Sequence, residues 1–199
     1  MNRRRLIFFL IMLILALERP VRAQAYRNAV RVPPVDVYQS MLNFADRKEY
    51  AKVSGSLNVL SPIVNHITAK FKDNPTVMIK TAIVKGDPDE ILLGVQTLII
   101  LDIKDLLDDA LQKIEQTPDA SKSAVKAARL NYELLSPYVQ KKDFAADQKI
   151  KKSFTESFRA METGSLYSAE KTAVSVEQVK RYCVEIVFNL SRVFPSRAG

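Results

Sequence analysis

Residues 88–116 read PDEILLGVQTLIILDIKDLLDDALQKIEQ, and this stretch decides the fold. Asp87 precedes its opening proline and Glu90 follows three residues after Asp87, which is a capping box with proline at the first helical position. Residues 91–93 and 98–101 are apolar on almost every side of a helix. A helix that is apolar all round is buried. The sequence therefore predicts that this helix lies at the centre of a bundle.

Towards its C-terminal end the same helix becomes amphipathic. Its apolar stripe consists of Ile103, Leu106, Leu107, Ala110, Leu111 and Ile114. Asp102, Asp105 and Asp109 project from the opposite side, and Asp108 completes the densest acidic cluster in the chain. A calcium or iron site is one reading, but helical spacing holds these carboxylates apart and no oxygen-rich loop is present. We expect a solvated helix face, on which replacing Asp105 by Ala costs little.

The remainder of the chain also has helical patterning. Only five glycines occur, no Asn-Gly or Asp-Gly hairpin turn appears, and Asn74 and Thr117 each stand before a proline as helix caps. The expected helices are 35–46, 48–72, 75–85, 88–116, 120–141, 144–162 and 167–194. In the last of these, one stripe consists of Val176, Val179, Cys183, Ile186, Val187, Leu190 and Phe194. We expect an all-α, up-and-down helical bundle in which this stripe packs on the central helix, with Ile186 and Leu190 in the core.

A short pattern occurs twice. Leu60-Ser61-Pro62-Ile63-Val64 recurs as Leu135-Ser136-Pro137-Tyr138-Val139, seventy-five residues later. A duplicated helical hairpin explains the repeat, and so does coincidence, because few residues match and two copies are too few for a solenoid. Proline inside a helix removes an N–H group and crowds the carbonyl four residues back. We therefore expect Pro62 and Pro137 to kink long helices.

The N-terminal residues resemble an export signal. Arg3, Arg4 and Arg5 precede an apolar run over residues 6–17, and Ala23-Gln24-Ala25 offers the small residues of a cleavage site. Twelve apolar residues make a helix of about 18 Å, too short for the hydrocarbon core of a membrane. We expect a signal peptide at 1–25, an extended lead-in at 26–34 and a single helical domain at 35–195, in a protein that is periplasmic or secreted. Twin-arginine export stays open, although the general secretory route fits the strongly apolar run better.

The charge balance narrows the classes of partner. The whole chain has a formal charge of +8, which falls to +4 once the five Arg and one Glu of the signal are removed. A net positive charge this small, together with export, argues against nucleic acid as the partner. Weak association with an anionic membrane surface stays open.

The residues that could take part in catalysis or metal binding have simpler structural interpretations. His66, the only histidine, falls at the rim of a buried helix face, and no second ligand stands at helical spacing beside it. Cys183 lies on an apolar stripe and cannot form an intramolecular disulfide. Lys122, Lys126 and Arg129 form a cationic helix face that we expect to be surface. No metal site or cofactor site is predicted. No catalytic set is predicted either, because a serine hydrolase would have only His66 as its base.

One helix carries a family resemblance. Ala128-Arg129-Leu130-Asn131-Tyr132-Glu133-Leu134-Leu135-Ser136-Pro137 resembles the Ala-Arg-x-x-Tyr-Glu-x-x-Glu-Pro helix of imelysin-like periplasmic proteins, which include iron-uptake components. The family pattern has an acid where this chain has Ser136, and the family's Gly-x-His-x-x-Glu metal signature does not occur in this sequence. The resemblance implies an exported helical bundle with a link to iron, and it carries over no metal ligand.

Two functional hypotheses follow, and a third is weaker. The first is a non-enzymatic accessory subunit that docks an envelope protein through its helix faces. The alternative is a metal- or small-ligand-binding component of a periplasmic uptake system, and an enzyme comes last. A groove opened by the proline kinks would be lined by Tyr132, Tyr138 and Tyr167, since tyrosine combines apolar area with a hydroxyl suited to a wet rim. The competing interpretation is that these are core tyrosines beside a harmless kink.

Overall fold

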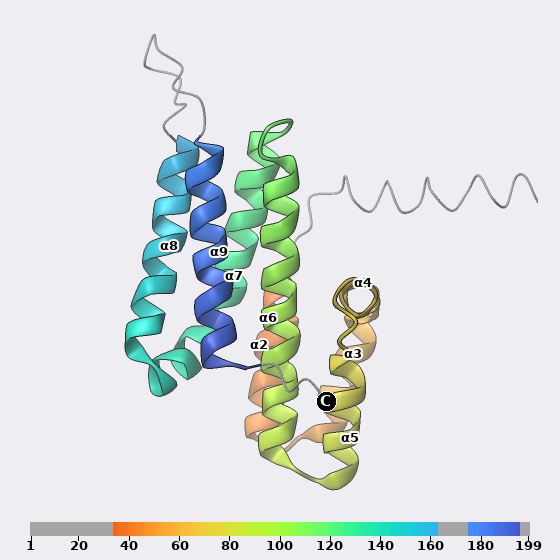
Figure 1. The fold of residues 1–199 in the computed structure, drawn as a ribbon. Coiled ribbons are helices and arrows are strands. Elements are labelled where there is room, and N and C mark those ends of the chain that lie inside the picture. Colours follow the sequence, from red (N-terminus) through yellow and green to blue (C-terminus); the bar gives the residue numbers. More distant parts are fainter. Residues whose placement is uncertain (1–33, 163–174, 196–199) are drawn as a thin grey trace, which may run out of the picture. The chain divides into compact units, whose positions relative to one another are not determined.

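Eight helices form the part of the chain that the computed structural model describes, residues 34–162 and 175–195, and these residues contain no strand (Figure 1). The helices are α2 (Val35–Asp46), α3 (Tyr50–Val59), α4 (Ser61–Phe71), α5 (Pro75–Lys85), α6 (Pro88–Lys113), α7 (Pro118–Lys142), α8 (Phe144–Glu162) and α9 (Val176–Val193). The all-α bundle is confirmed, and the bounds predicted for α2, α5 and α8 agree with the structure. No helix in these two ranges has the length and apolar character needed to cross a membrane. The predicted signal peptide, 1–25, and nearly all of the predicted lead-in lie outside the described residues.

Side-chain caps and glycine mark several helix ends. The Asp87 carboxylate accepts hydrogen bonds from the backbone N–H groups two and three residues later, at 3.1 and 3.0 Å, and so starts α6. Asn74 accepts the N–H three residues later at 3.1 Å and starts α5, which ends at Gly86 with φ of 68°. Thr117 does not cap α7 as predicted. Its hydroxyl instead donates to the carbonyl of Lys113 at 3.4 Å, in the preceding turn.

Helix α6 lies at the centre, as the sequence predicts. It packs against α2, α4, α5, α7 and α9 (Figure 1). The close approach of α5 depends on Gly94, because a Cβ atom there would lie 2.6 Å from a side-chain carbon of Ile79. Both apolar runs of α6 are largely buried, including Ile91, Leu98 and Ile99 at 0% exposure. The apolar content of this helix is therefore explained by neighbours on all sides.

The acidic side of α6 is covered at two of its aspartates, which corrects the prediction of a solvated face there, whereas Asp108 and Asp109 stay 46% and 37% exposed. Asp102 is 0% exposed and Asp105 is 6% exposed. Tyr38 from α2, His66 from α4 and Asn131 from α7 all reach these carboxylates. Helical periodicity gave the correct angle of the aspartates about the axis. It could not reveal that three other helices pack over that side.

Helix α9 packs with its predicted stripe inward. Val179, Cys183, Ile186 and Leu190 are all 1% exposed or less. The stripe contacts α8 more extensively than α6, so the expected contact with the central helix is the smaller of the two. Residues 167–174, predicted as the start of this helix, lie outside the described residues.

The two Leu-Ser-Pro segments have different structures. The helix predicted at 48–72 is divided, because α3 ends at Val59 and α4 begins at Ser61, with Pro62 in its first turn. Proline is tolerated there because the N–H groups of a first turn have no helical partner. Pro137 lies inside the continuous helix α7. The first segment therefore ends one helix and begins another, so the kink predicted at Pro62 is wrong.

Candidate functional site

The Asp147 carboxylate is the centre of a buried hydrogen-bond network between α7 and α8. Its Oδ1 accepts hydrogen bonds from the hydroxyls of Tyr132 at 2.5 Å and Ser136 at 2.8 Å. Its Oδ2 accepts from Gln140 at 3.1 Å and from the ammonium of Lys151 at 2.9 Å. Burial by itself would raise the pKa of this carboxyl, but the four hydrogen bonds outweigh burial and hold the pKa below its ordinary value. Asp147 is thus a charged carboxylate, hydrogen-bonded at both oxygens, that joins α7 to α8.

Asp102 accepts hydrogen bonds from helices on two sides of α6. The hydroxyl of Tyr38 donates to its Oδ2 at 3.1 Å, and the side-chain amide of Asn131 donates to the same oxygen at 2.8 Å. Both partners are 0% exposed. The contact joins α2 and α7 through a side chain of the central helix, and a buried polar group of this kind is costly to leave without its partners.

Asp105 joins α4 to α6. Its Oδ1 lies 3.1 Å from Nε2 of His66 and 3.0 Å from the ammonium of Lys70, which also reaches Asp108 at 2.8 Å. Burial alone would lower the pKa of Lys70, but the two carboxylates outweigh it and raise that pKa. The His66 side chain is 39% exposed, so its predicted place at the rim is confirmed. Its carboxylate partner was missed because it comes from a different helix.

These networks do not assemble a metal centre. No group of three or more His, Cys, Asp or Glu side chains in the described ranges is arranged to hold a metal ion. The Cys183 thiol is 1% exposed, and burial, with a smaller contribution from Asp108, raises its pKa to about 12. The prediction that this cysteine packs as an apolar side chain is confirmed.

The tyrosines predicted to line a groove are not brought together at the surface. Tyr132 is 1% exposed, and burial together with the Asp147 carboxylate raises the pKa of its hydroxyl far above the ordinary value. Tyr138 is half-buried, with its hydroxyl 3.5 Å from Asp46. Tyr167 lies outside the described residues. A side chain as buried as Tyr132 offers a partner no contact area in this conformation, and the groove that the sequence predicts stays a prediction.

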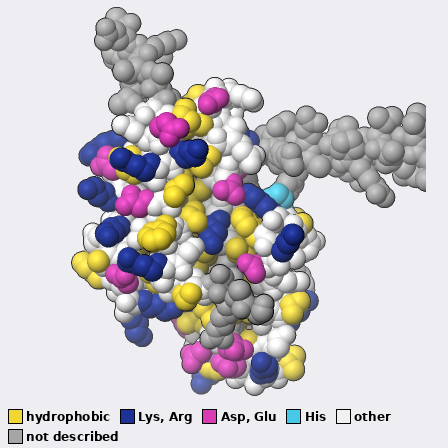
Figure 2. Space-filling view, in the orientation of Figure 1, with side chains coloured by type: hydrophobic (Ala, Val, Ile, Leu, Met, Phe, Trp, Pro, Cys, Tyr) yellow, Lys and Arg dark blue, Asp and Glu magenta, His cyan; other side chains and the backbone are white. Residues whose placement is uncertain are grey.

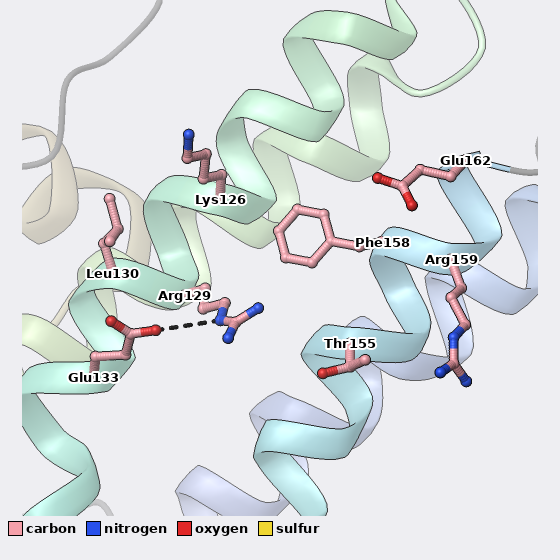
Figure 3. Close-up of a pocket in the computed structure, with 8 residues that line it drawn as sticks. All are labelled: Lys126, Arg129, Leu130, Glu133, Thr155, Phe158, Arg159 and Glu162. Carbon is pink, nitrogen blue, oxygen red and sulfur yellow. Dashed lines mark hydrogen bonds and ion pairs between the residues drawn. The ribbon is translucent and has the colours of Figure 1, made fainter. Parts of the chain in front are cut away.

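A groove does run between α7 and α8, in a different place. We call it the α7–α8 groove; it encloses about 560 Å³ and is lined by Lys126, Arg129, Leu130 and Glu133 of α7 and by Thr155, Phe158, Arg159 and Glu162 of α8. Figure 3 shows the ring of Phe158 between the two helices, opposite Lys126 and Arg129. Arg129 is paired with Glu133 at 3.2 Å, whereas Lys126 forms no ion pair with any described residue. The predicted cationic face of α7 is confirmed as surface, and it forms one wall of this groove.

A second and larger groove lies on the other side of α8. We call it the α8–α9 groove; it encloses about 890 Å³ and is lined by Lys149, Lys152, Ser153 and Glu156 of α8 and by Arg181, Tyr182, Val184, Glu185 and Phe188 of α9. Val184 is 58% exposed and Phe188 is 63% exposed. Figure 2 shows Lys and Arg side chains gathered over α8 and hydrophobic side chains exposed along α9. Helix α8 is therefore a ridge with a partly apolar, partly cationic groove on either side.

Charge is unevenly divided along the chain. Residues 34–117 carry nine Lys or Arg and twelve Asp or Glu, whereas residues 118–162 and 175–195 together carry twelve Lys or Arg and eight Asp or Glu. The grooves thus lie in the basic part of the molecule. The mild overall charge conceals this division, which a count by segment would have found. A second indication of the grooves in the sequence is that Val184 and Phe188 are apolar but lie outside the buried stripe of the last helix.

No family model matches this chain, and neither a curated protein nor a solved structure is similar to it at a significant level. The resemblance to imelysin-like proteins over one helix therefore stays a prediction.

Proposed function

We propose that this protein is a non-enzymatic, exported accessory protein that docks an envelope protein through helices α7, α8 and α9. The observation that carries the proposal is the α8–α9 groove, where Val184 and Phe188 are more than half exposed beside cationic side chains. Exposed apolar area with a polar rim is typical of protein interaction sites. The buried carboxylates, by contrast, are occupied in joining helices, and this leaves them no evident chemical task.

Export is supported by the sequence alone. Three arginines followed by an apolar run and an Ala-Gln-Ala site form the pattern of a cleaved signal peptide. An envelope partner is the natural consequence, because a protein delivered outside the cytoplasm meets its partners there. The mild net charge fits a protein partner better than a nucleic acid.

The proposal is tested by photo-crosslinking in intact host cells. A photoreactive amino acid is placed at Val184 or at Thr155, one position in each groove, and at Val84 on α5 as a control that is 88% exposed. We expect Val184 or Thr155 to give a discrete adduct with one envelope protein, and Val84 to give none. Retention of the chain in the cytoplasm, or equal crosslinking from all three positions, would contradict the proposal.

A second candidate function is the carrying of a small organic anion, and the α7–α8 groove favours it. About 560 Å³ is within the size range of small-molecule sites, and Phe158 lies opposite Lys126, which forms an ion pair with no acid in the described ranges. Titration calorimetry with benzoate and phenyl phosphate tests this function. Binding that is lost in Lys126→Ala and retained in Lys80→Ala, an exposed lysine of α5, would support it; heats equal to those of dilution would count against it.

A further inference from the structure

We propose that the α8–α9 groove binds an amphipathic helical segment of a partner protein, in which apolar side chains one turn apart are flanked by carboxylates. The inference rests on the docking function proposed above and specifies the chemistry of the docked segment. It is carried by the size of the groove, by the spacing of its apolar side chains and by the charge of its rim.

The groove has the dimensions of a short helical segment. Along α9 it extends from Arg181 to Phe188, and along α8 from Lys149 to Glu156. Seven residue steps span about 10 Å on either helix, or roughly two helical turns. A cavity of about 890 Å³ between two packed helices gives a segment of that length walls on both sides. This is the geometry in which an amphipathic helix is recognised by its apolar face.

The apolar contact surface is provided by α9. Val184 and Phe188 are four residues apart, so their side chains lie on one face of the helix, and they remain 58% and 63% exposed. Tyr182 adds an aromatic ring at the edge of the groove, where Arg181 lies over it with its guanidinium carbon 4.8 Å from the ring centroid. Large apolar and aromatic side chains that become buried on binding are typical anchors of an interface, so these positions can anchor a partner.

The rim selects for negative charge. Lys149 and Lys152 form no ion pair with any described residue, whereas both acids of the groove are engaged. Glu185 accepts a hydrogen bond from the Ser153 hydroxyl at 2.8 Å. Glu156 is likewise occupied, because Arg159 pairs with it at 2.8 Å. The lining thus has three cations, Lys149, Lys152 and Arg181, against two carboxylates, one of which is already paired with Arg159 outside the groove. Among the described residues the groove keeps an excess of positive charge, which carboxylates on the docked segment would neutralise.

The experiment uses the whole exported chain and two labelled helical peptides. Both peptides carry Leu at i, i+3, i+4 and i+7; one carries Glu at the flanking positions and the other carries Lys. Binding is measured by fluorescence anisotropy at low and high salt, and vesicles containing phosphatidylglycerol are tested in parallel. The variants are Phe188→Ser and Lys152→Glu in the groove, with Val84→Ser and Lys80→Glu on α5 as matched exposed controls.

We expect the Glu peptide to bind the unaltered protein and the Lys peptide to bind at least about tenfold more weakly. Phe188→Ser should weaken binding of the Glu peptide by about tenfold or more at every salt concentration. Lys152→Glu should weaken it by roughly three- to tenfold at low salt and less at high salt, because salt screens the rim charges. Both α5 controls should stay within about twofold of the unaltered protein.

Three results would overturn the inference. The first is equal affinity for the two peptides, and the second is an affinity that neither groove variant changes. The third is binding to vesicles that depends on Phe188 and Lys152 while neither peptide binds, which would assign the surface to a lipid. The docking function is judged separately by crosslinking in cells: a Val184 adduct without peptide binding contradicts only the acidic segment, whereas no adduct from either groove contradicts the docking function itself.

Discussion

Helices α6 and α9 depart from the usual distribution of residue types in opposite directions. The central helix α6 buries two aspartates, Asp102 and Asp105, at 0% and 6% exposure. Helix α9 leaves Val184 and Phe188 more than half exposed. Charged residues are ordinarily outside, and large apolar residues exposed side by side are informative.

The difference follows from the number of neighbours each helix has. Five helices pack around α6, so most of its surface is covered and its buried polar groups need partners from other helices. Helix α9 packs against α8 and α6, and among the described residues no other helix covers the side that carries Val184 and Phe188. Burial therefore depends on what surrounds a helix as much as on its residues. An apolar side chain on the open side of α9 contributes nothing to the core, which leaves it available for a partner.

The largest expected effect tests the buried stripe of α9. Leu190 is 0% exposed, and Leu190→Ala should lower the free energy of unfolding by about 2–5 kcal/mol, because it removes buried methyl groups and leaves a cavity. Urea denaturation followed by circular dichroism measures the change. A loss below about 1 kcal/mol would mean that α9 is not docked through this stripe.

The next effect tests whether the acidic side of α6 is interior. Asp105→Ala should lower the free energy of unfolding by roughly 1–3 kcal/mol, because the variant leaves His66 and Lys70 without this carboxylate. Asp109→Ala, one turn further along, should lower it by less than about 1 kcal/mol, since this side chain is 37% exposed and is paired only within the helix as far as the described residues show. If both variants lost the same free energy of unfolding, the acidic side of α6 would be solvated, as helical periodicity alone predicts.

A pH experiment tests the network around Asp147. Its pKa is lower in the folded protein than the ordinary value of 3.8, so the unfolded chain takes up the proton first as pH falls. The stabilisation is fully present above pH 3.8 and is lost as pH falls through the folded pKa. Unfolding midpoints in urea, measured at neutral pH and near pH 3, should converge between the unaltered protein and Asp147→Asn. A constant difference across that interval would show that Asp147 is not held as a buried carboxylate.

The smallest effect tests the open side of α9. Phe188→Ala should change the free energy of unfolding by no more than about 0.5 kcal/mol, since the side chain is 63% exposed. Differential scanning calorimetry of this variant beside Leu190→Ala, two residues away, makes the comparison within one helix. Destabilisation by Phe188→Ala of about 2 kcal/mol or more, the size expected of a core side chain, would show that the α8–α9 groove is closed in solution and would remove the basis for docking there.

Local signals predicted most of the fold. Asn74 and Asp87 before prolines gave the starts of α5 and α6, and the apolar run at 98–101 gave the central position of α6. Periodicity also gave the inward face of α9. It failed at Pro62, where a proline expected to kink a helix instead begins one, because sequence alone does not say whether the preceding turn continues.

The grooves were harder to predict because they form between helices. Phe158 reads as an ordinary apolar position, and only the packing of α7 beside α8 places it opposite Lys126. For Tyr132 the sequence leaves a groove position and a core position as alternatives, and the Asp147 carboxylate that draws its hydroxyl into the core comes from the next helix. Periodicity places a residue on a face of its own helix; it carries no information about the side chains that approach from another.

The lone thiol of Cys183 has a practical consequence. Because it is 1% exposed and its pKa is raised to about 12, a thiol reagent cannot reach or activate it while α9 stays in place. Its rate of modification thus records how often α9 separates from its neighbours, with no engineered label. A segment that binds across α8 and α9 would slow that modification, whereas a ligand bound elsewhere on the molecule would slow it only by stabilising the whole bundle. The chain therefore contains its own reporter for the part of the surface on which docking is proposed.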